Sequence, residues 1–203
     1  MKVKICGLTN LADARAAAEA GADFLGFVFA PSARRVDLLA ARAFWPDLPR
    51  GVPTVAVFRD QTLAEVERVL QQLRPDFLQF HGAERPAFCR VFERPVIRAL
   101  PARVPADLAL AAGFVDLATY FLVDVPKGDA GSLAGDVARA AIALPKPVLL
   151  AGGLNPDNVR ALVERFSPFG VDVASGVESA PGVKDHALVR AFIGNAKAAR
   201  RGG

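Results

Sequence analysis

Cysteine, histidine and long apolar runs are all scarce in this sequence of 203 residues. The two cysteines, Cys6 and Cys89, lie far apart, which favours free thiols in the reducing cytoplasm over a disulfide. The two histidines, His81 and His186, show no spacing typical of metal ligands, so no metal site is expected. No apolar stretch approaches about 18 uninterrupted residues, which excludes a membrane span. The first residues also lack the apolar run and basic flank of a secretory signal.

A concentrated basic patch is absent as well, although the net charge is +4 and the pI is near 9.4. The arginines are spread along the chain, and they cluster only in the last segment, KAARRGG (197–203), where a frayed end is expected. Nucleic acid is therefore not expected as a partner. Arginine far outnumbers lysine, which is typical of a thermophile or a GC-rich genome; for a thermophile, a homodimer would be one stabilising route.

Eight short apolar runs alternate with segments that have helical periodicity. The runs occupy 2–6, 23–29, 53–58, 76–80, 95–100, 120–124, 147–152 and 171–175. Strands that alternate with helices pair in parallel through right-handed crossovers, and eight such units predict a minimal (βα)8 barrel spanning 1–203 as one domain. The alternative is an open doubly wound sheet, which normally carries a GxGxxG turn that CGLTNL (6–11) lacks.

Capping residues predict where three of the helices begin. They are Asn10, Thr62 and Asn155. Thr62 is followed three residues later by Glu65, as in a capping box. The fifth helix is the weakest, because Pro101 and Pro105 interrupt its segment. We expect it to be poorly formed or replaced by a loop.

Side chains able to do chemistry gather at the predicted carboxyl ends of the strands, where barrels of this class have their active sites. In the first strand, a period of two places Lys4 and Cys6 on one face and the apolar Val3 and Ile5 on the other. The apolar pair should face the helices, which turns Cys6 into the barrel. The same reasoning turns Asp124 inward, so the two side chains converge at the barrel mouth.

Two glycine-bearing turns follow the last two strands, AGGLNPDN (151–158) and ASGVESAPG (174–182). Backbone amides without a Cβ nearby can wrap an anion, and a short helix beginning after Gly176 would add its dipole. Barrels of this class bind phosphate in the loops after strands seven and eight. The turns therefore predict a phosphate site.

Several longer motifs follow one another over nearly the whole chain: VKICGLTN, GADFLGFVFAPSARRV, FLQFHG, FLVD, LAGGLNPDNV and VDVASGVESAPGVKD. In sequence and in order they resemble the motifs of the phosphoribosylanthranilate isomerase family. The resemblance implies a (βα)8 barrel whose fifth helix is typically a loop. It also implies an Amadori rearrangement in tryptophan biosynthesis, in which phosphoribosylanthranilate becomes 1-(2-carboxyphenylamino)-1-deoxyribulose 5-phosphate without a cofactor or metal.

The same resemblance implies roles for individual residues. Cys6 matches the general base, Asp124 the general acid, and Arg35 the arginine that holds the anthranilate carboxylate. The remaining implied substrate-binding positions are His81, Gly131, Gly152, Gly153, Asp172, Ser175, Gly176 and Val177. One stretch departs from the family, because GDAGSLAG (128–135) keeps only part of the usual glycine-rich loop after the sixth strand.

Acid–base chemistry sets two requirements for this pair. Asp124 must be protonated to act first, so we expect desolvation to raise its pKa. Cys6 must be a thiolate, which a positive charge nearby would stabilise, and Lys4 is in register for that. Cys89 is expected in the core, and Arg34 is expected to be a solvated loop residue.

Two other classes of protein compete with this interpretation. Another phosphosugar barrel enzyme is one: a ribulose-phosphate epimerase needs His and Asp metal ligands at strand ends, and a relative of indole-glycerol-phosphate synthase needs a lysine pair where only Lys4 is found. A non-catalytic protein that binds phosphometabolites or basic surfaces is the other. It would not need both Cys6 and Asp124.

Overall fold

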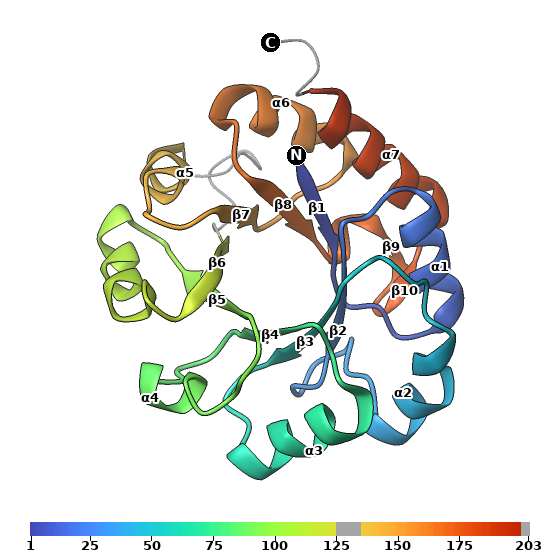
Figure 1. The fold of residues 1–203 in the computed structure, drawn as a ribbon. Helices are drawn as coiled ribbons and strands as arrows, with labels where there is room; N and C mark the ends of the chain where they lie inside the picture. Colours follow the sequence, from blue (N-terminus) through green and yellow to red (C-terminus); the bar gives the residue numbers. More distant parts are fainter. Residues whose placement is uncertain (125–134, 200–203) are drawn as a thin grey trace.

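Eight parallel strands close into a barrel in the computed structural model, which describes residues 1–124 and 135–199 (Figure 1). The strands are β1 (Lys2–Ile5), β2 (Phe24–Val28), β3 (Thr54–Phe58), β4 (Phe77–Phe80), β5 (Val96–Pro101), β6 (Ala118–Asp124), β7 (Val148–Ala151) and β8 (Gly170–Val173). Each strand pairs with the next, and β8 pairs with β1 to complete the ring. The predicted (βα)8 architecture is confirmed, with every strand within two residues of its expected position.

The helices surround the strands, as Figure 1 shows. They are α1 (Leu11–Glu19), α2 (Leu38–Phe44), η1 (Trp45–Asp47), α3 (Leu63–Leu73), α4 (Pro86–Cys89), η2 (Pro105–Phe114), α5 (Gly135–Ile142), α6 (Pro156–Phe166) and α7 (His186–Ala198). All three predicted caps accept hydrogen bonds from the first turns of their helices, and Thr62 and Glu65 form the full capping box. No helix in the described part of the chain is long and apolar enough to cross a membrane.

The segment between β5 and β6 differs from the others, as the sequence predicts. It holds η2, a 3-10 helix, in place of an α-helix. Pro105 occupies its first position, where a missing N–H costs nothing. The fifth helix is therefore poorly formed as an α-helix but is not reduced to a loop.

Two apolar layers lie on opposite sides of the strand wall. Val3 and Ile5 pack outward against the helices, whereas Lys4 and Cys6 point into the barrel, which confirms the predicted orientation of β1. Near the amino ends of the strands, the rings of Phe24, Phe77 and Tyr120 pack with centroids 5.5–5.9 Å apart and form a floor. The open space of the barrel is thus confined to the carboxyl ends.

A short hairpin follows the last barrel strand. The 3-10 helix η4 (Ser175–Val177) leads into β9 (Glu178–Ala180), which pairs antiparallel with β10 (Val183–Lys184). The expected helix beginning after Gly176 is thus wrong: one turn begins at Ser175 and a strand follows it. A Cβ at Gly176 would collide with the carbonyl oxygen of Leu154, so glycine allows the last two loops to touch.

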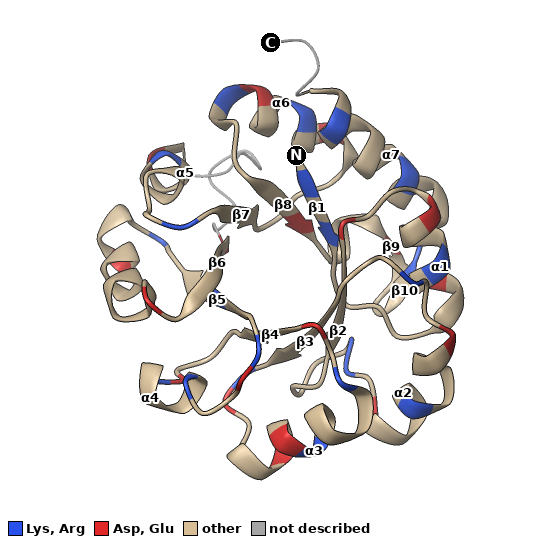
Figure 2. Ribbon diagram, viewed as in Figure 1, with Lys and Arg blue, Asp and Glu red and all other residues tan. Residues whose placement is uncertain are grey.

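Charged side chains are distributed over the outer helices. Figure 2 shows Lys and Arg as well as Asp and Glu at many places around the ring, although α7 carries only the basic residues Arg190 and Lys197.

Candidate active site

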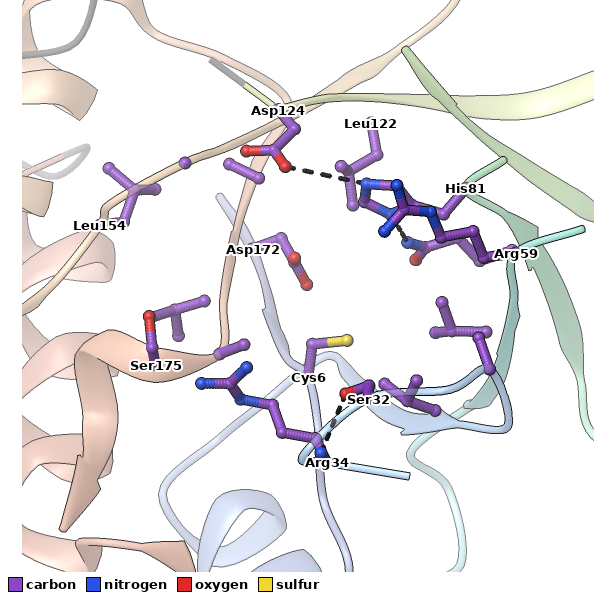
Figure 3. Close-up of a pocket in the computed structure, with 18 of the residues that line it drawn as sticks. Cys6, Ser32, Arg34, Arg59, His81, Leu122, Asp124, Leu154, Asp172 and Ser175 are labelled. Atoms are coloured by element: carbon purple, nitrogen blue, oxygen red, sulfur yellow. Dashed lines mark hydrogen bonds and ion pairs between the residues drawn. The ribbon is translucent and has the colours of Figure 1, made fainter. Parts of the chain in front are cut away.

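A cavity of about 430 Å³ opens at the carboxyl ends of the strands (Figure 3). Its volume is in the range of small-molecule sites. Cys6, Asp124, His81 and Asp172 all line it, together with Arg34 and the Gly152–Gly153 turn. The structure thus brings together the two residues expected to be catalytic, from strands on different sides of the barrel.

Cys6 follows directly after β1, where its backbone N–H donates to the carbonyl of Val173 at 2.8 Å. Its side chain lines the cavity, yet the residue is only 7% exposed. Burial raises the pKa of the Cys6 thiol, and the nearby positive charges of Lys4 and Lys184 offset this only in part. In the free protein the thiol form is therefore favoured, contrary to the expected thiolate.

Lys4 is the charge expected to activate Cys6, and it is already paired. Its Nζ lies 2.7 Å from Asp172 Oδ1 on the neighbouring strand β8, and its side chain is fully buried. Burial alone would lower the pKa of Lys4, but the negative charge of Asp172 and the proximity of Cys6 raise it. Because Asp172 neutralises Lys4 and itself raises the pKa of Cys6, the lysine stabilises the thiolate less than its position suggests.

Asp124 ends β6 and faces His81 across the cavity. Its Oδ2 lies 3.7 Å from His81 Nε2. The other ring nitrogen of His81 lies 3.2 Å from Gln79 Nε2, and in this orientation of the amide Gln79 donates, which leaves the ring proton on Nε2 toward Asp124. The Asp124 side chain is 45% exposed, so it is less desolvated than the sequence predicts.

The arginine on the cavity wall is Arg34, whereas Arg35, the residue predicted for this place, is exposed and does not line the cavity. The Val36 N–H donates to the carbonyl of Val28, and Arg35 forms a bridge with β2 at the same residue. This extended backbone turns neighbouring side chains to opposite sides. The expectation of a solvated Arg34 is therefore wrong, whereas the carboxylate-binding role expected of Arg35 stays a prediction, although Arg35 does not reach this cavity.

The predicted phosphate turns are only partly on the cavity wall. Gly152 and Gly153 line it with φ values of 103° and 62°, a left-handed backbone that glycine tolerates, and Ser175 lies beside them. Gly176 and Val177 do not line it; Gly176 contacts the preceding loop and Val177 is buried. Gly131 lies outside the described residues.

Sequence reasoning missed two charged residues behind Arg34. Glu178 binds Nε and Nη2 of Arg34, both at 2.8 Å, and Lys184 Nζ lies 2.8 Å from Glu178 Oε1. Both lie in the motif SGVESAPGVKD (175–185), whose glycines predict a phosphate site but whose pattern assigns no role to these two charges. Cys89 is buried in the core as predicted, and His186 is half-exposed and bonded to Asp13. Within residues 1–124 and 135–199 no group of three or more His, Cys, Asp or Glu is placed to hold a metal.

Comparison with known proteins decides the family. The sequence profile described as N-(5'phosphoribosyl)anthranilate (PRA) isomerase matches residues 3–195. The chain belongs to this family. It is 42% identical over 199 residues to the N-(5'-phosphoribosyl)anthranilate isomerase of Pseudomonas fluorescens, covering 95% of this chain and 94% of that protein.

Solved structures of the family have the same fold. The phosphoribosyl anthranilate isomerase of Thermotoga maritima is similar at a TM-score of 0.87 and 35% identity, covering 98% of this chain and 99% of that chain. A second, at a TM-score of 0.85, 35% identity and the same two coverages, is a phosphoribosyl anthranilate isomerase in complex with reduced 1-(o-carboxyphenylamino)-1-deoxyribulose 5-phosphate.

Proposed function

We propose that this isomerase acts through Cys6 as general base and Asp124 as general acid. The activity of its family converts the aldose N-(5'-phosphoribosyl)anthranilate to a ketose in tryptophan biosynthesis, and this chain is an isomerase of that kind. The observation that supports the residue roles is the convergence of a buried thiol and a carboxyl group in one cavity. An acid and a base on opposite sides of the substrate are what an Amadori rearrangement requires.

Each proton transfer has a place in the cavity. Asp124 donates a proton to the furanose ring oxygen, the bond from that oxygen to C1′ breaks, and a protonated Schiff base forms with the anthranilate nitrogen. The thiolate form of Cys6, which is the minor form in the free protein, then takes the proton from C2′, and the electron pair moves to give an enolamine. The enolamine gains a proton at C1′ and loses the hydroxyl proton at C2′, which produces the ketone.

The two anionic ends of the substrate match two parts of the cavity wall. Arg34 takes the anthranilate carboxylate, since a planar guanidinium can bind both oxygens. The backbone amides of Gly152 and Gly153, with Ser175, hold the phosphate. A similar family member is in complex with reduced 1-(o-carboxyphenylamino)-1-deoxyribulose 5-phosphate, a ligand that carries both a carboxylate and a phosphate.

His81 and Asp172 contribute to the site without removing a substrate proton. His81 presents its ring toward Asp124 and assists the acid, whereas Asp172 balances the buried Lys4. For the chain as a whole, residues 1–203 act as one domain in the cytoplasm, where both unpaired thiols are stable. A homodimer is a further part of the proposal, and sedimentation velocity tests it.

Fluorescence of the anthranilate group tests the catalytic roles. Cys6→Ser and Asp124→Asn should each lower kcat for phosphoribosylanthranilate by about 10²–10⁴-fold, the usual share of one acid or base. Cys89→Ser is the matched control, because that thiol is buried outside the cavity and activity should stay near that of the wild type. Wild-type turnover no faster than that of the two variants would overturn the proposal and favour a non-catalytic binding protein.

A further inference from the structure

Arg34 is held in place from several directions. Gly7 lies directly against it: a Cβ there would come within 2.6 Å of Arg34 Cδ, and its φ of 72° also favours glycine. The Arg34 side chain is 27% exposed, and it reaches the cavity edge over Gly7. The long, flexible side chain of Arg34 is thus restricted to one conformation.

Glu178 determines how the guanidinium is turned. Its two oxygens accept from Nε and Nη2 of Arg34, both at 2.8 Å, a bidentate pair along one edge of the group. The Glu178 side chain is 5% exposed, so solvent hardly weakens the pair. This contact occupies one edge and leaves Nη1 and the second N–H of Nη2 as a fork for another carboxylate.

Glu178 shares its negative charge between two cations, Arg34 and Lys184, so it does not fully neutralise Arg34. The Nζ of Lys184, fully buried, donates to Glu178 Oε1 at 2.8 Å and to the Ala174 carbonyl at 2.9 Å. Burial lowers the pKa of Lys184, although Glu178 works against this. With Lys4 and Asp172 beside them, these side chains form three cations and two anions, so one positive charge is in excess beside the cavity.

The hairpin that carries Glu178 and Lys184 is tied to the loops around Arg34. Thr9 Oγ1 donates to the Gly182 carbonyl at 2.6 Å, and the Lys184 backbone N–H donates to Asp13 Oδ2 at 3.0 Å. A Cβ on Gly182 would lie 3.3 Å from the Ala33 carbonyl oxygen, so the tip of the hairpin packs against the Arg34 loop itself. Hairpin and loop are one assembly.

We propose that the β9–β10 hairpin fixes the position of Arg34. In this proposal Glu178 is a positioning residue, and its contact orients the Arg34 guanidinium toward the substrate carboxylate. The inference rests on the proposed role of Arg34. It gives the segment ESAPGVK (178–184) a function in substrate selection, since a correctly turned fork distinguishes a carboxyphenyl group from a plain phenyl group.

A pair of ligands tests this directly. One is reduced 1-(o-carboxyphenylamino)-1-deoxyribulose 5-phosphate, and the other is the same compound without the carboxylate. Glu178→Gln should weaken binding of the carboxylate ligand about tenfold and change binding of the other less than twofold, as expected for one charge-assisted contact that loses its alignment. Glu164→Gln, at an exposed ion pair on α6, is the matched control and should change neither.

A double-mutant cycle separates positioning from a merely structural role. On an Arg34→Met background, Glu178→Gln should add no further loss for the carboxylate ligand, because Glu178 acts through Arg34. In turnover, Glu178→Gln should raise KM more than it lowers kcat. Equal loss for both ligands, or additive losses in the double variant, would overturn the inference.

The result remains readable if the proposed function fails. Inactivity of the wild-type protein toward phosphoribosylanthranilate would overturn the proposed function. Weaker binding of only the carboxylate ligand by Glu178→Gln would still support the inference that Glu178 positions Arg34. Full activity with unchanged ligand discrimination in the variant would overturn the inference alone.

Discussion

Arg34 and Arg98 are each paired with a buried glutamate of their own, Glu178 and Glu84. Their side chains lie on opposite sides of the strand wall: Arg34 lines the cavity, and Arg98 faces the helices. Arg98 leaves β5 outward, is 2% exposed, and donates to Glu84 at 2.9 Å and to the Phe80 and Gly82 carbonyls at 3.1 and 2.7 Å. Its guanidinium also lies 4.7 Å from the Phe114 ring centre on η2. Arg34 keeps part of its fork at the cavity. Arg34 is thus available to a ligand, whereas the donors of Arg98 are directed to partners outside the cavity.

The largest expected effect is on the Arg98 side of this comparison. Arg98→Met leaves Glu84 buried without its cation, which should lower the free energy of unfolding by about 3–5 kcal/mol. Arg34→Met should lower it by less, about 1 kcal/mol, because Lys184 still pairs with the buried Glu178, and it should also weaken ligand binding. Urea unfolding of both variants measures the difference. Equal losses of stability would remove the distinction between the two arginines.

A smaller effect is expected within the group of charges beside Cys6. Asp172→Asn removes a negative charge that raises the pKa of Cys6, so this pKa should fall. Since the proposed general base is the Cys6 thiolate, the acid limb of kcat/KM should move to lower pH in Asp172→Asn, and to higher pH in Lys4→Met.

The rate of alkylation by iodoacetamide against pH, located by mass spectrometry, measures the Cys6 pKa directly. Cys89 serves as an internal control, because burial raises its pKa to about 11 and it has no exposed surface. An acid limb that moves the same way in both variants would contradict the opposing roles of Lys4 and Asp172.

The smallest effect belongs to a pair that is neither buried nor near the cavity. Arg160 and Glu164 are one helical turn apart on α6, 2.8 Å from each other and 63% and 50% exposed. Glu164→Gln should change the free energy of unfolding by no more than about 0.5 kcal/mol, since solvent screens such pairs. Urea unfolding checks this, and a loss above about 1 kcal/mol would mean that burial is not what separates the three pairs.

Local regularity explains what the sequence predicts well. The period of two in β1 orients Cys6, and short-range capping places the starts of the helices at Asn10 and Thr62. The loop that carries Arg34 and Arg35 has no period, so the inward-facing member of the pair depends on a backbone bridge to Val28 that the sequence does not reveal.

The support behind Arg34 is also beyond local reasoning. Glu178 is separated from Arg34 by 144 positions, and their contact exists only because the hairpin folds back over the first two loops. The motif that contains Glu178 and Lys184 has glycines that predict a turn, but nothing in its pattern indicates which residue the two charges contact. Hydrophobic periodicity relates residues only within one helix or strand, so it cannot indicate a contact between residues so far apart in the sequence.

The pairing of β1 with β8 has a consequence for how the nascent chain folds. Lys4 and Asp172 are 168 positions apart, so the first strand leaves the ribosome long before its partner exists. Contacts of such high sequence separation form late and slow the folding of a chain. Until β8 has been synthesised and has paired with β1, Lys4 lacks its partner Asp172. The side of the cavity that β8 forms beside Cys6 is also missing. Ring closure is therefore the event that creates the reaction chamber, and the nascent chain has no active site before it.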